Sequence, residues 1–239
     1  MTMTEDIDVV VFDILGTMVD EPGGLRTALG AELPTADDDH LDALVAQWQQ
    51  YAEHEQQRIA AGRRPYANSE LIDREAAERI AAQAGVEDPD AVTRLVARAQ
   101  RPAPWADSVA TLARMARSFP VLGLSNASRA ALLRLNAHAG LRWHLALSAE
   151  NAQAYKPRPE VYRLALDAVR TAPERVLMVA AHAWDLRGAQ TLGLRTAYVP
   201  RPAGDPPTDS DAFDLTAHSL DDLMTTLTGG PDQAVLHRS

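Results

Sequence analysis

The sequence predicts an α/β protein with a doubly wound, mostly parallel sheet and an inserted helical domain. Short runs of β-branched and other apolar residues recur along the chain and alternate with helical patterns of about ten residues. Between residues 21 and 101 this alternation stops and only helical spacing is found. Polar side chains follow several of the apolar runs, and in an open parallel sheet such positions form the ligand-binding edge.

The expected strands are continuous apolar runs, which are typical of strands covered on both faces by helices. They are residues 9–12 (VVVF), 121–124 (VLGL), 176–180 (VLMVA), 196–199 (TAYV) and, more weakly, 213–216 (FDLT). Helical patterns separate them at residues 106–117, 129–139, 159–169 and 183–193.

The inserted region contains three stretches with helical spacing, residues 40–62, 68–85 and 88–100. Asn68 or Ser69, and Asp88 with Pro89, are suitable helix starts, whereas Gly62 and Gly85 are suitable ends. We therefore expect a Rossmann-like core made of residues 1–20 and 102–228, a helical cap of residues 21–101 and a flexible tail of residues 229–239. The alternative is one mixed domain without a separable cap.

Composition excludes several classes of function. The chain has 239 residues, 46% of them hydrophobic, and a net charge of -10, which argues against binding to nucleic acid or to an anionic membrane. It has no cysteine, so disulfides, thiolate zinc sites and cysteine nucleophiles are excluded. Since the acidic start MTMTEDID lacks an apolar signal core and no run is long enough to span a bilayer, we expect a cytoplasmic protein.

Polar residues stand at or just after the ends of the expected strands. They are Asp13 with Thr17, Ser125 with Asn126, Lys156 in YKPRPEVY, and His182 with Asp185 in VAAHAWDLRGA. Because the carboxyl ends of parallel strands meet at one edge, these side chains are expected to converge there.

This set of residues is suited to covalent catalysis. Asp13 can attack as a nucleophile, and a nearby Lys156 would keep it ionised. The hydroxyls of Thr17 and Ser125 can orient its carboxylate oxygens. Alternatively, Asp13 only caps the turn that follows it.

The motifs VVVFDILGT, LSN, YKP and AHAWDLRGA, in this order, resemble the haloacid dehalogenase superfamily, and more closely its 2-haloacid dehalogenase branch. The resemblance covers nearly the whole chain, since the helical insertion after the first strand corresponds to the family's cap. It implies an aspartyl-ester intermediate on Asp13. Phosphatases of the superfamily have a second Asp where this chain has Leu15 and a magnesium-binding carboxylate where it has Ala181. These differences disfavour a metal site, and we expect neither metal nor cofactor.

For a short 2-haloacid, the resemblance implies attack of Asp13 on the carbon that bears the halogen, with inversion, followed by hydrolysis of the ester. It places Thr17 beside the nucleophile and Ser125 and Asn126 on the substrate carboxylate. It further implies that Lys156 lies against Asp13, that Asp185 holds this lysine, and that Tyr162 lies in the same neighbourhood.

Two positions in the substrate region depart from the family pattern. Leu15 stands where a Tyr is frequent, and Gln49 stands where a cap Arg binds halide or carboxylate. A glutamine donates hydrogen bonds but cannot form a charge-assisted bidentate pair. Three basic residues of the cap either take the place of this missing Arg or belong to a solvent-exposed face: Arg58, Arg63 and Arg64.

His182 is a further departure, because the best-known members have Asn at this position. A histidine titrates near neutral pH and can take a proton from the water that hydrolyses the ester, and Glu21 is placed in sequence to orient it. Alternatively, His182 is a hydrogen-bonded structural residue and Glu21 is a solvent-exposed charge in the linker. Trp184 is expected to pack beneath the site, while Trp48 and Tyr51 either form an apolar wall over it or pack the cap against the core.

Other hypotheses remain open at this stage. One is opening of a small cyclic amino acid such as an azetidine carboxylate, another is phosphate-ester hydrolysis, and a third is an idle binding or regulatory protein. The resemblance also implies a homodimer. The apolar cap positions Leu41, Leu44, Val45 and Trp48 can either pair two chains or be buried within one.

Overall fold

The computed structural model describes residues 6–229, which form a six-stranded parallel sheet flanked by helices. The strand order is β3-β2-β1-β4-β5-β6, and all neighbours pair in parallel. The strands are β1 Val9–Asp13, β2 Val121–Ser125, β3 Leu145–Ser148, β4 Val176–Ala180, β5 Arg195–Tyr198 and β6 Leu215–Thr216. The strand order reverses at β1, so the carboxyl end of β1 lies where open sheets of this kind bind ligands.

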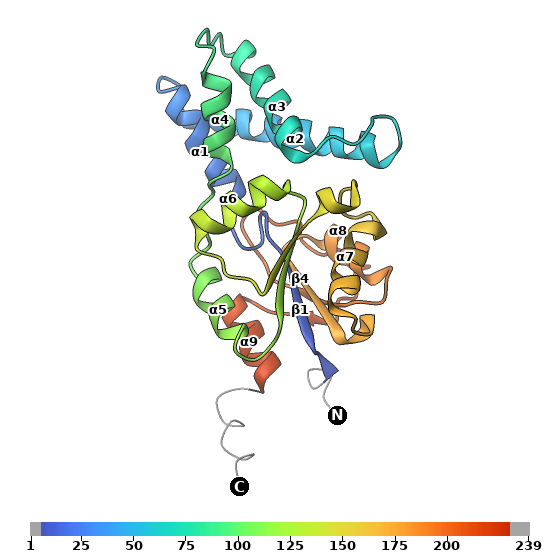
Figure 1. The fold of residues 1–239 in the computed structure, drawn as a ribbon. Helices are drawn as coiled ribbons and strands as arrows, with labels where there is room; N and C mark the ends of the chain where they lie inside the picture. Colours follow the sequence, from blue (N-terminus) through green and yellow to red (C-terminus); the bar gives the residue numbers. More distant parts are fainter. Residues whose placement is uncertain (1–5, 230–239) are drawn as a thin grey trace.

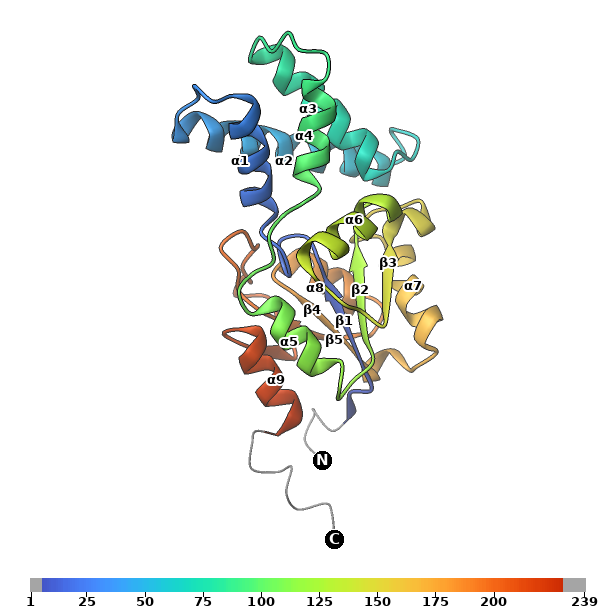
Figure 2. The same ribbon diagram turned by 60° about the vertical axis from the view of Figure 1, so that its left-hand side comes forward.

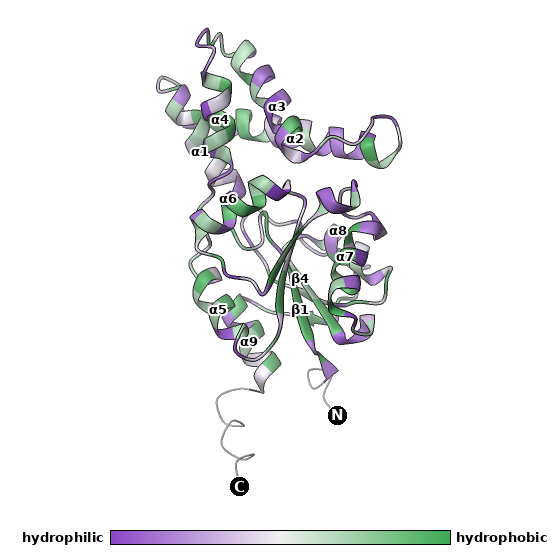
Figure 3. Cartoon of the chain, in the orientation of Figure 1, coloured by the Kyte–Doolittle hydropathy of each residue, from purple (hydrophilic) through white to green (hydrophobic). Residues whose placement is uncertain are grey.

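Helices cover both faces of the sheet, which confirms the doubly wound arrangement (Figure 1). On one face pack α5 Ser108–Met115, α6 Arg129–Ala139 and α9 Leu220–Thr228. On the other pack α7 Pro159–Val169 and α8 Ala183–Gln190, and short 3₁₀ turns lie at η2 Ala149–Ala152 and η3 Pro173–Arg175. In β1, Val10 and Phe12 enter one core and Val9 and Val11 the other, so the strand is apolar throughout. Figure 3 shows this concentration of hydrophobic residues along the central strands.

Four helices lie between β1 and α5, beyond the carboxyl ends of the strands (Figure 2). They are α1 Glu21–Glu32, α2 Asp38–Ala60, α3 Ser69–Gln83 and α4 Ala91–Ala99. Their apolar faces form a hydrophobic cluster that contains Leu41, Leu44, Val45 and Trp48. These side chains are therefore buried within one chain.

The chain enters and leaves this helical insertion at adjacent points. Val19 and Pro104 form an antiparallel bridge, and the amide of Asp20 donates to the carbonyl of Ala103 over 2.8 Å. The insertion thus begins and ends beside the same strand, β1.

Several elements differ from the sequence-based expectation. Helix α1 was not predicted, because its first turn contains Pro22, Gly23 and Gly24, which have low helix propensity. The Asp20 side chain accepts from the amide of Gly23 and caps this turn, and a Cβ on Gly24 would lie 3.0 Å from Pro102, so the glycine permits close packing.

Strand β3 was also not predicted, since it is a short edge strand with exposed residues such as Leu145. The helices expected at 106–117 and 183–193 and the strand expected at 213–216 are shorter in the structure. Of the expected tail 229–239, Gly229 ends α9 in a left-handed conformation, and residues 230–239 lie outside the described part. Within residues 6–229, no helix has the length and apolar character needed to cross a membrane.

Candidate active site

A buried ammonium group lies between two carboxylates at the end of β1. Lys156 Nζ is 2.9 Å from Asp13 Oδ1 and 2.7 Å from Asp185 Oδ2. All three side chains are buried. The convergence predicted from the strand ends is thus present in the structure.

Thr17 fixes the other oxygen of Asp13. Its hydroxyl donates to Asp13 Oδ2 over 2.6 Å and accepts from the amide of Ala181 over 2.9 Å. The hydroxyl therefore joins the ends of the neighbouring strands β1 and β4. Both oxygens of Asp13 are consequently held by donors, and its carboxylate orientation is defined.

The charges around Lys156 favour its protonated form. Burial acts to lower the pKa of Lys156, but the negative charges of Asp13 and Asp185 outweigh it and hold the pKa above its ordinary value. Tyr162 donates to Asp185 Oδ1 over 2.6 Å, and burial raises the pKa of this phenol, so it remains a donor. A buried ion pair is stabilising only when its remaining polar atoms are satisfied, and Tyr162 satisfies one of them.

The end of β2 supports the Lys156 segment. Asn126 Oδ1 accepts from the backbone amide of Lys156 over 2.9 Å, and its Nδ2 contacts Gln56 Oε1 of α2 at 3.4 Å. Ser125 is fully buried, and its hydroxyl accepts from the amide of Ala127 over 3.1 Å. Both residues therefore lie beside the site, held by the loops around it.

His182 lies directly before α8 and faces the turn after β1. Its Nε2 is 3.3 Å from the carbonyl oxygen of Leu15, and its ring stacks on Trp184 with centroids 5.7 Å apart. Gly16 allows this approach, because it has φ +76° and a Cβ there would lie 2.5 Å from the same nitrogen. Among residues 6–229, no hydrogen bond joins His182 to Glu21, so the expected pairing of these two groups is not formed in this structure.

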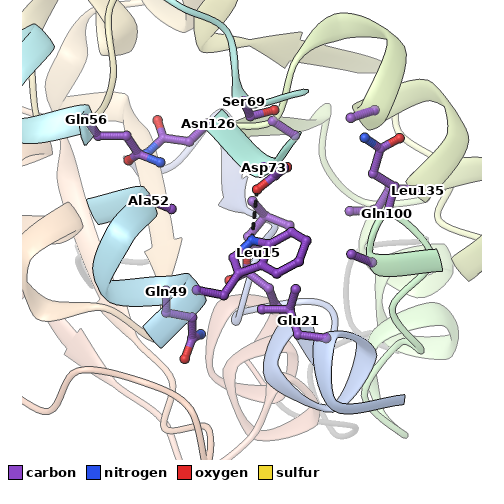
Figure 4. A pocket seen from close by; sticks show the side chains of 15 residues that line it. Leu15, Glu21, Gln49, Ala52, Gln56, Ser69, Asp73, Gln100, Asn126 and Leu135 are labelled. Carbon is purple, nitrogen blue, oxygen red and sulfur yellow. Dashed lines mark hydrogen bonds between the residues drawn. The ribbon is translucent and has the colours of Figure 1, made fainter. Parts of the chain in front are cut away.

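A cavity of about 80 Å³ lies between the helical insertion and the strand ends (Figure 4). Leu15 and Asn126, in the loops after β1 and β2, line it on the side of the sheet, whereas Asp13 is not among its lining residues. Further residues line it from the insertion, from α6 and from the loop before α6: Glu21, Leu25, Trp48, Gln49, Ala52, Gln56, Ser69, Asp73, Ala99, Gln100, Ala127, Ala131 and Leu135.

Two carboxyl groups in this cavity have raised pKa values. Burial, then the negative charges of Asp73 and Asp13, raises the pKa of Glu21 to about 7. Burial raises the pKa of Asp73 to about 6, partly opposed by the hydrogen bond from Trp48 Nε1. Glu21 thus lines the cavity and is partly exposed, so it is more enclosed than a free linker charge.

The basic residues considered as substitutes for the missing cap Arg do not reach the cavity. Arg58 and Arg64 pair with Glu55, and Arg64 also pairs with Glu75; neither they nor Arg63 line it. Tyr51 likewise does not line it; its hydroxyl donates to Glu75 of α3. Trp48 does line it, as one of the two alternatives held, and it also belongs to the hydrophobic cluster of the insertion.

Asp73 and Gln100 are among the cavity residues that sequence reasoning missed. Both lie within long helical patterns of mixed polarity, where a polar side chain is ordinarily exposed. Only the packing of α3 and α4 above the strand ends reveals that they face inward. Within residues 6–229 there is no cluster of three or more His, Cys, Asp or Glu side chains suited to a metal ion.

An aspartate at the switch point of a parallel sheet, a lysine against it and a helical insertion after the first strand together define a class of hydrolase. The family model for haloacid dehalogenase-like hydrolases matches residues 7–193, and the chain belongs to this family.

Characterised relatives and solved structures share most of the chain. An (S)-2-haloacid dehalogenase 1 from Pseudomonas sp. (strain CBS-3) is 30% identical over 206 residues, 82% of this chain and 86% of the relative. An (S)-2-haloacid dehalogenase from Pseudomonas fluorescens is 26% identical over 205 residues, covering 84% and 87%.

A crystal structure of an L-2-haloacid dehalogenase matches with a TM-score of 0.84 and 30% identity, over 94% of this chain and 100% of the other. The L-2-haloacid dehalogenase from Xanthobacter autotrophicus with covalently bound chloropropionic acid matches with a TM-score of 0.80 and 25% identity, over 93% and 99%.

Proposed function

We propose that this hydrolase cleaves the carbon–halogen bond of short 2-haloacids through an ester on Asp13 and releases the 2-hydroxy acid with inverted configuration. The observation that carries the proposal is the buried Asp13–Lys156–Asp185 arrangement, with Lys156 Nζ within 2.9 Å of the nucleophile. The similarity to L-2-haloacid dehalogenases over more than 90% of the chain supports it.

In the first step, an oxygen of Asp13 attacks the substrate carbon from the side opposite the halogen. The carbon–halogen bond breaks with its electron pair, halide leaves, and an ester forms between Asp13 and the 2-carbon. Thr17 and Lys156 hold the carboxylate, so little orientational freedom is lost when it attacks. We assign Ser125 and Asn126 to the substrate carboxylate, since both lie at the neighbouring strand end.

In the second step, water attacks the carboxyl carbon of the Asp13 ester. The bond between this carbon and the oxygen attached to the substrate's 2-carbon then breaks. Water supplies the new oxygen of Asp13, and the product leaves with the old one. One proton of this water passes to the product oxygen, which becomes the hydroxyl group, and the other is released as Asp13 returns to its carboxylate form. We assign proton removal from this water to His182, whose ring lies against the turn after the nucleophile. Glu21 lies near enough to Asp13 for its pKa to respond to that charge, and we assign it to orient His182 once substrate is bound.

The remaining side chains position these groups. Asp185 and Tyr162 hold Lys156, and Leu15, Gln49 and Trp48 shape the substrate cavity. Trp184 supports His182 by stacking. Neither position that supplies acidic groups in the related phosphatases, Leu15 and Ala181, carries a carboxylate here.

The proposal is tested by halide release from L-2-chloropropionate, bromoacetate and fluoroacetate in excess chelator. We expect release by the wild-type chain and background rates for Asp13→Asn. A single turnover in ¹⁸O-labelled water should give unlabelled product and labelled Asp13, and His182→Ala should accumulate the ester. Release of phosphate from esters, without any halide release, would contradict the proposal.

We also propose that residues 21–101 act as a cap over a core of residues 1–20 and 102–228. The cavity walls support this, because they come from both parts. A homodimer and a cytoplasmic location stay predictions, which light scattering and cell fractionation would check. The exposed Leu71 and Leu133 on α3 and α6 are suitable contact residues for the dimer.

A further inference from the structure

The turn after the nucleophile is fastened to the rest of the core by two side chains that do not line the cavity. Trp105 Nε1 donates to the carbonyl of Gly16 over 3.0 Å. Arg201 Nε donates to the carbonyl of the next residue, Thr17, over 2.9 Å. Trp105 lies in the segment that returns from the insertion, and Arg201 lies after β5. Two parts of the chain that are distant in sequence therefore converge on this turn.

Arg201 is itself held in place by its surroundings. Its Nη2 donates to Asp107 Oδ1 over 2.7 Å, and its guanidinium carbon lies 5.9 Å from the centre of the Trp105 ring. The other oxygen of Asp107 accepts from the amide of Leu220, the first residue of α9. The Arg201 side chain is only 9% exposed. Because a guanidinium presents its donors in a rigid fork, one side chain can bond two acceptors and lie over a ring.

Thr17 connects this support to the nucleophile. Its hydroxyl donates to Asp13 Oδ2 and accepts from the amide of Ala181, whereas its carbonyl accepts from Arg201. The hydroxyl and the carbonyl belong to the same residue, so a shift of the Thr17 backbone also shifts the hydroxyl away from Asp13. Hydrogen bonds from a charged donor are stronger than those from a neutral one. Arg201 is therefore well suited to fix the position of Thr17.

We propose that Arg201 is a positioning residue for the attack of Asp13 on the substrate, because it fixes the Thr17 backbone and thereby keeps the Thr17 hydroxyl on Asp13. The inference rests on the proposed function. Displacement at carbon requires the attacking oxygen to approach opposite the halogen, and the step is fast only when this geometry is held in advance. Lys156 holds one oxygen of Asp13, and the contact from Arg201 through Thr17 holds the other.

The proposal predicts an effect on rate and not on substrate binding. Arg201 is not among the residues that line the cavity, so its loss removes no contact with the substrate. If Arg201 only stabilised the fold, its loss would reduce the number of folded molecules and leave the maximal rate of each folded molecule unchanged. The maximal rate per folded molecule therefore distinguishes positioning from general stabilisation.

Arg201→Met is the first variant, because it removes all the donors and keeps an apolar chain of similar length. With enzyme in excess over L-2-chloropropionate, halide release in a single turnover measures the attack of Asp13. We expect the maximal rate per folded molecule to fall by about tenfold, with the half-saturating concentration within about twofold of the wild type. Circular dichroism at the assay temperature gives the folded fraction. An unchanged maximal rate would overturn the proposal.

Arg201→Lys is a milder change, because it keeps the positive charge but loses the fork that bonds both Thr17 and Asp107. We expect an intermediate loss of about threefold in the maximal rate, again with an unchanged half-saturating concentration. If Arg201→Met does not fold, this variant decides the question. A maximal rate equal to that of the wild type would then overturn the proposal.

Arg175→Met is the matched control. Arg175 donates through Nε and Nη2 to the two oxygens of Asp8, which lies directly before β1 at the end of the strand opposite to Asp13. This variant thus also removes an Arg–Asp pair beside the same strand, and it should retain the wild-type maximal rate. Equal losses of rate in Arg175→Met and Arg201→Met would overturn the proposal, since any such pair would then have the same effect.

Hydrogen exchange separates this inference from the proposed function. The amide of Ala181 donates to Thr17 Oγ, so its exchange rate reports on the position of Thr17 without any substrate. In Arg201→Met this amide should exchange about tenfold faster relative to the amide of Leu124 in β2, because global unfolding would accelerate both amides alike. If the wild type releases no halide while this acceleration is found, the proposed reaction fails and the positioning role stands. Halide release with an unchanged exchange ratio and an unchanged maximal rate gives the opposite result.

Discussion

At the scale of single residues, the site depends on how each buried charge is compensated. Lys156 is shared by Asp13 and Asp185, and each carboxylate also receives a neutral hydroxyl donor, from Thr17 and Tyr162 respectively. Removing one partner leaves a buried charged or polar group without compensation. This destabilises the fold more than replacing all of the partners by apolar side chains would. Neutral donors that touch Asp185 should therefore influence both stability and rate.

Tyr162→Phe tests this coupling. The change keeps the ring and removes the hydrogen bond to Asp185, so we expect the free energy of unfolding to fall by about 1–3 kcal/mol. We expect kcat to fall by about tenfold, because Lys156 loses part of its support against Asp13. Urea unfolding and steady-state halide release measure the two effects. Tyr51→Phe, which removes a hydroxyl bond to Glu75 within the insertion, is the control and should leave kcat unchanged.

Glu21 gives a stability prediction that depends on pH. Its pKa is about 7 in the folded chain against an ordinary 4.5, so the folded state holds the proton more tightly than the unfolded state. The stability of the wild-type chain should therefore be reduced progressively as pH rises from about 4.5 to about 7, and the full cost should persist above that range.

Glu21→Gln removes this cost, so its advantage over the wild type in unfolding free energy should grow by roughly 1–3 kcal/mol between pH 5 and pH 8. The carboxyl group is partly exposed, and contact with solvent reduces the cost of its charge. Urea unfolding at both pH values gives the comparison. The exposed Glu78→Gln on α3 is the control, and equal pH dependence in the two variants would contradict the prediction.

At the scale of secondary structure, the contacts between α3 and α6 join the insertion to the sheet. Ser128 precedes α6, and its hydroxyl accepts from the amide of Ala131 at the first turn and donates to Glu70 of α3. Its own amide donates to Ser69 Oγ. One residue thus serves as a helix cap and as a link between the two parts that enclose the cavity.

Ser128→Ala should lower the free energy of unfolding by about 1–2 kcal/mol and raise KM several-fold, because the cavity wall formed by α3 loses a fixed contact. Ser219→Ala removes the equivalent capping bond of α9, from the amide of Asp222, without touching the insertion. The control should show a similar loss of stability and an unchanged KM. Thermal unfolding and substrate titration of halide release separate the two effects.

The elements that could be predicted from the sequence are those whose structure is determined by a local pattern of apolar residues. Strand β1 and helices α6 and α7 agree closely with the expected ranges, since continuous apolar runs and clear amphipathic spacing determined them. Helix α1 and strand β3 depended on tertiary contacts instead. Likewise, the convergence of Asp13, Lys156 and Asp185 followed from parallel-sheet topology, whereas the inward position of Asp73 and Gln100 followed only from how the insertion packs.

At the scale of the whole molecule, the insertion and the sheet have separate hydrophobic clusters. Residues of α1–α4 form one cluster, and the two faces of the sheet form the others. The chain passes between the parts at one place, where Val19 bridges Pro104 and the amide of Asp20 donates to Ala103. The core therefore does not need the insertion to complete its sheet or to bury its strands.

Replacing residues 21–102 with a short Gly-Ser loop should accordingly give a folded core. Because residues 20 and 103 are hydrogen-bonded neighbours, a few residues can connect them without strain. We expect the shortened chain to keep the circular dichroism of an α/β protein and a cooperative thermal transition, at a lower midpoint since surface below the insertion becomes exposed.

The same chain should lose halide release, because it retains Asp13, Lys156 and Asp185 but lacks Gln49, Asp73 and the other cavity walls of the insertion. Far-ultraviolet circular dichroism, thermal unfolding and the chloropropionate assay measure these outcomes. A matched loop that replaces only residues 61–66, between α2 and α3, should preserve the thermal transition and most of the activity. If the shortened core unfolds without cooperativity, the two-part organisation is wrong, and the insertion must be an integral layer of a single domain.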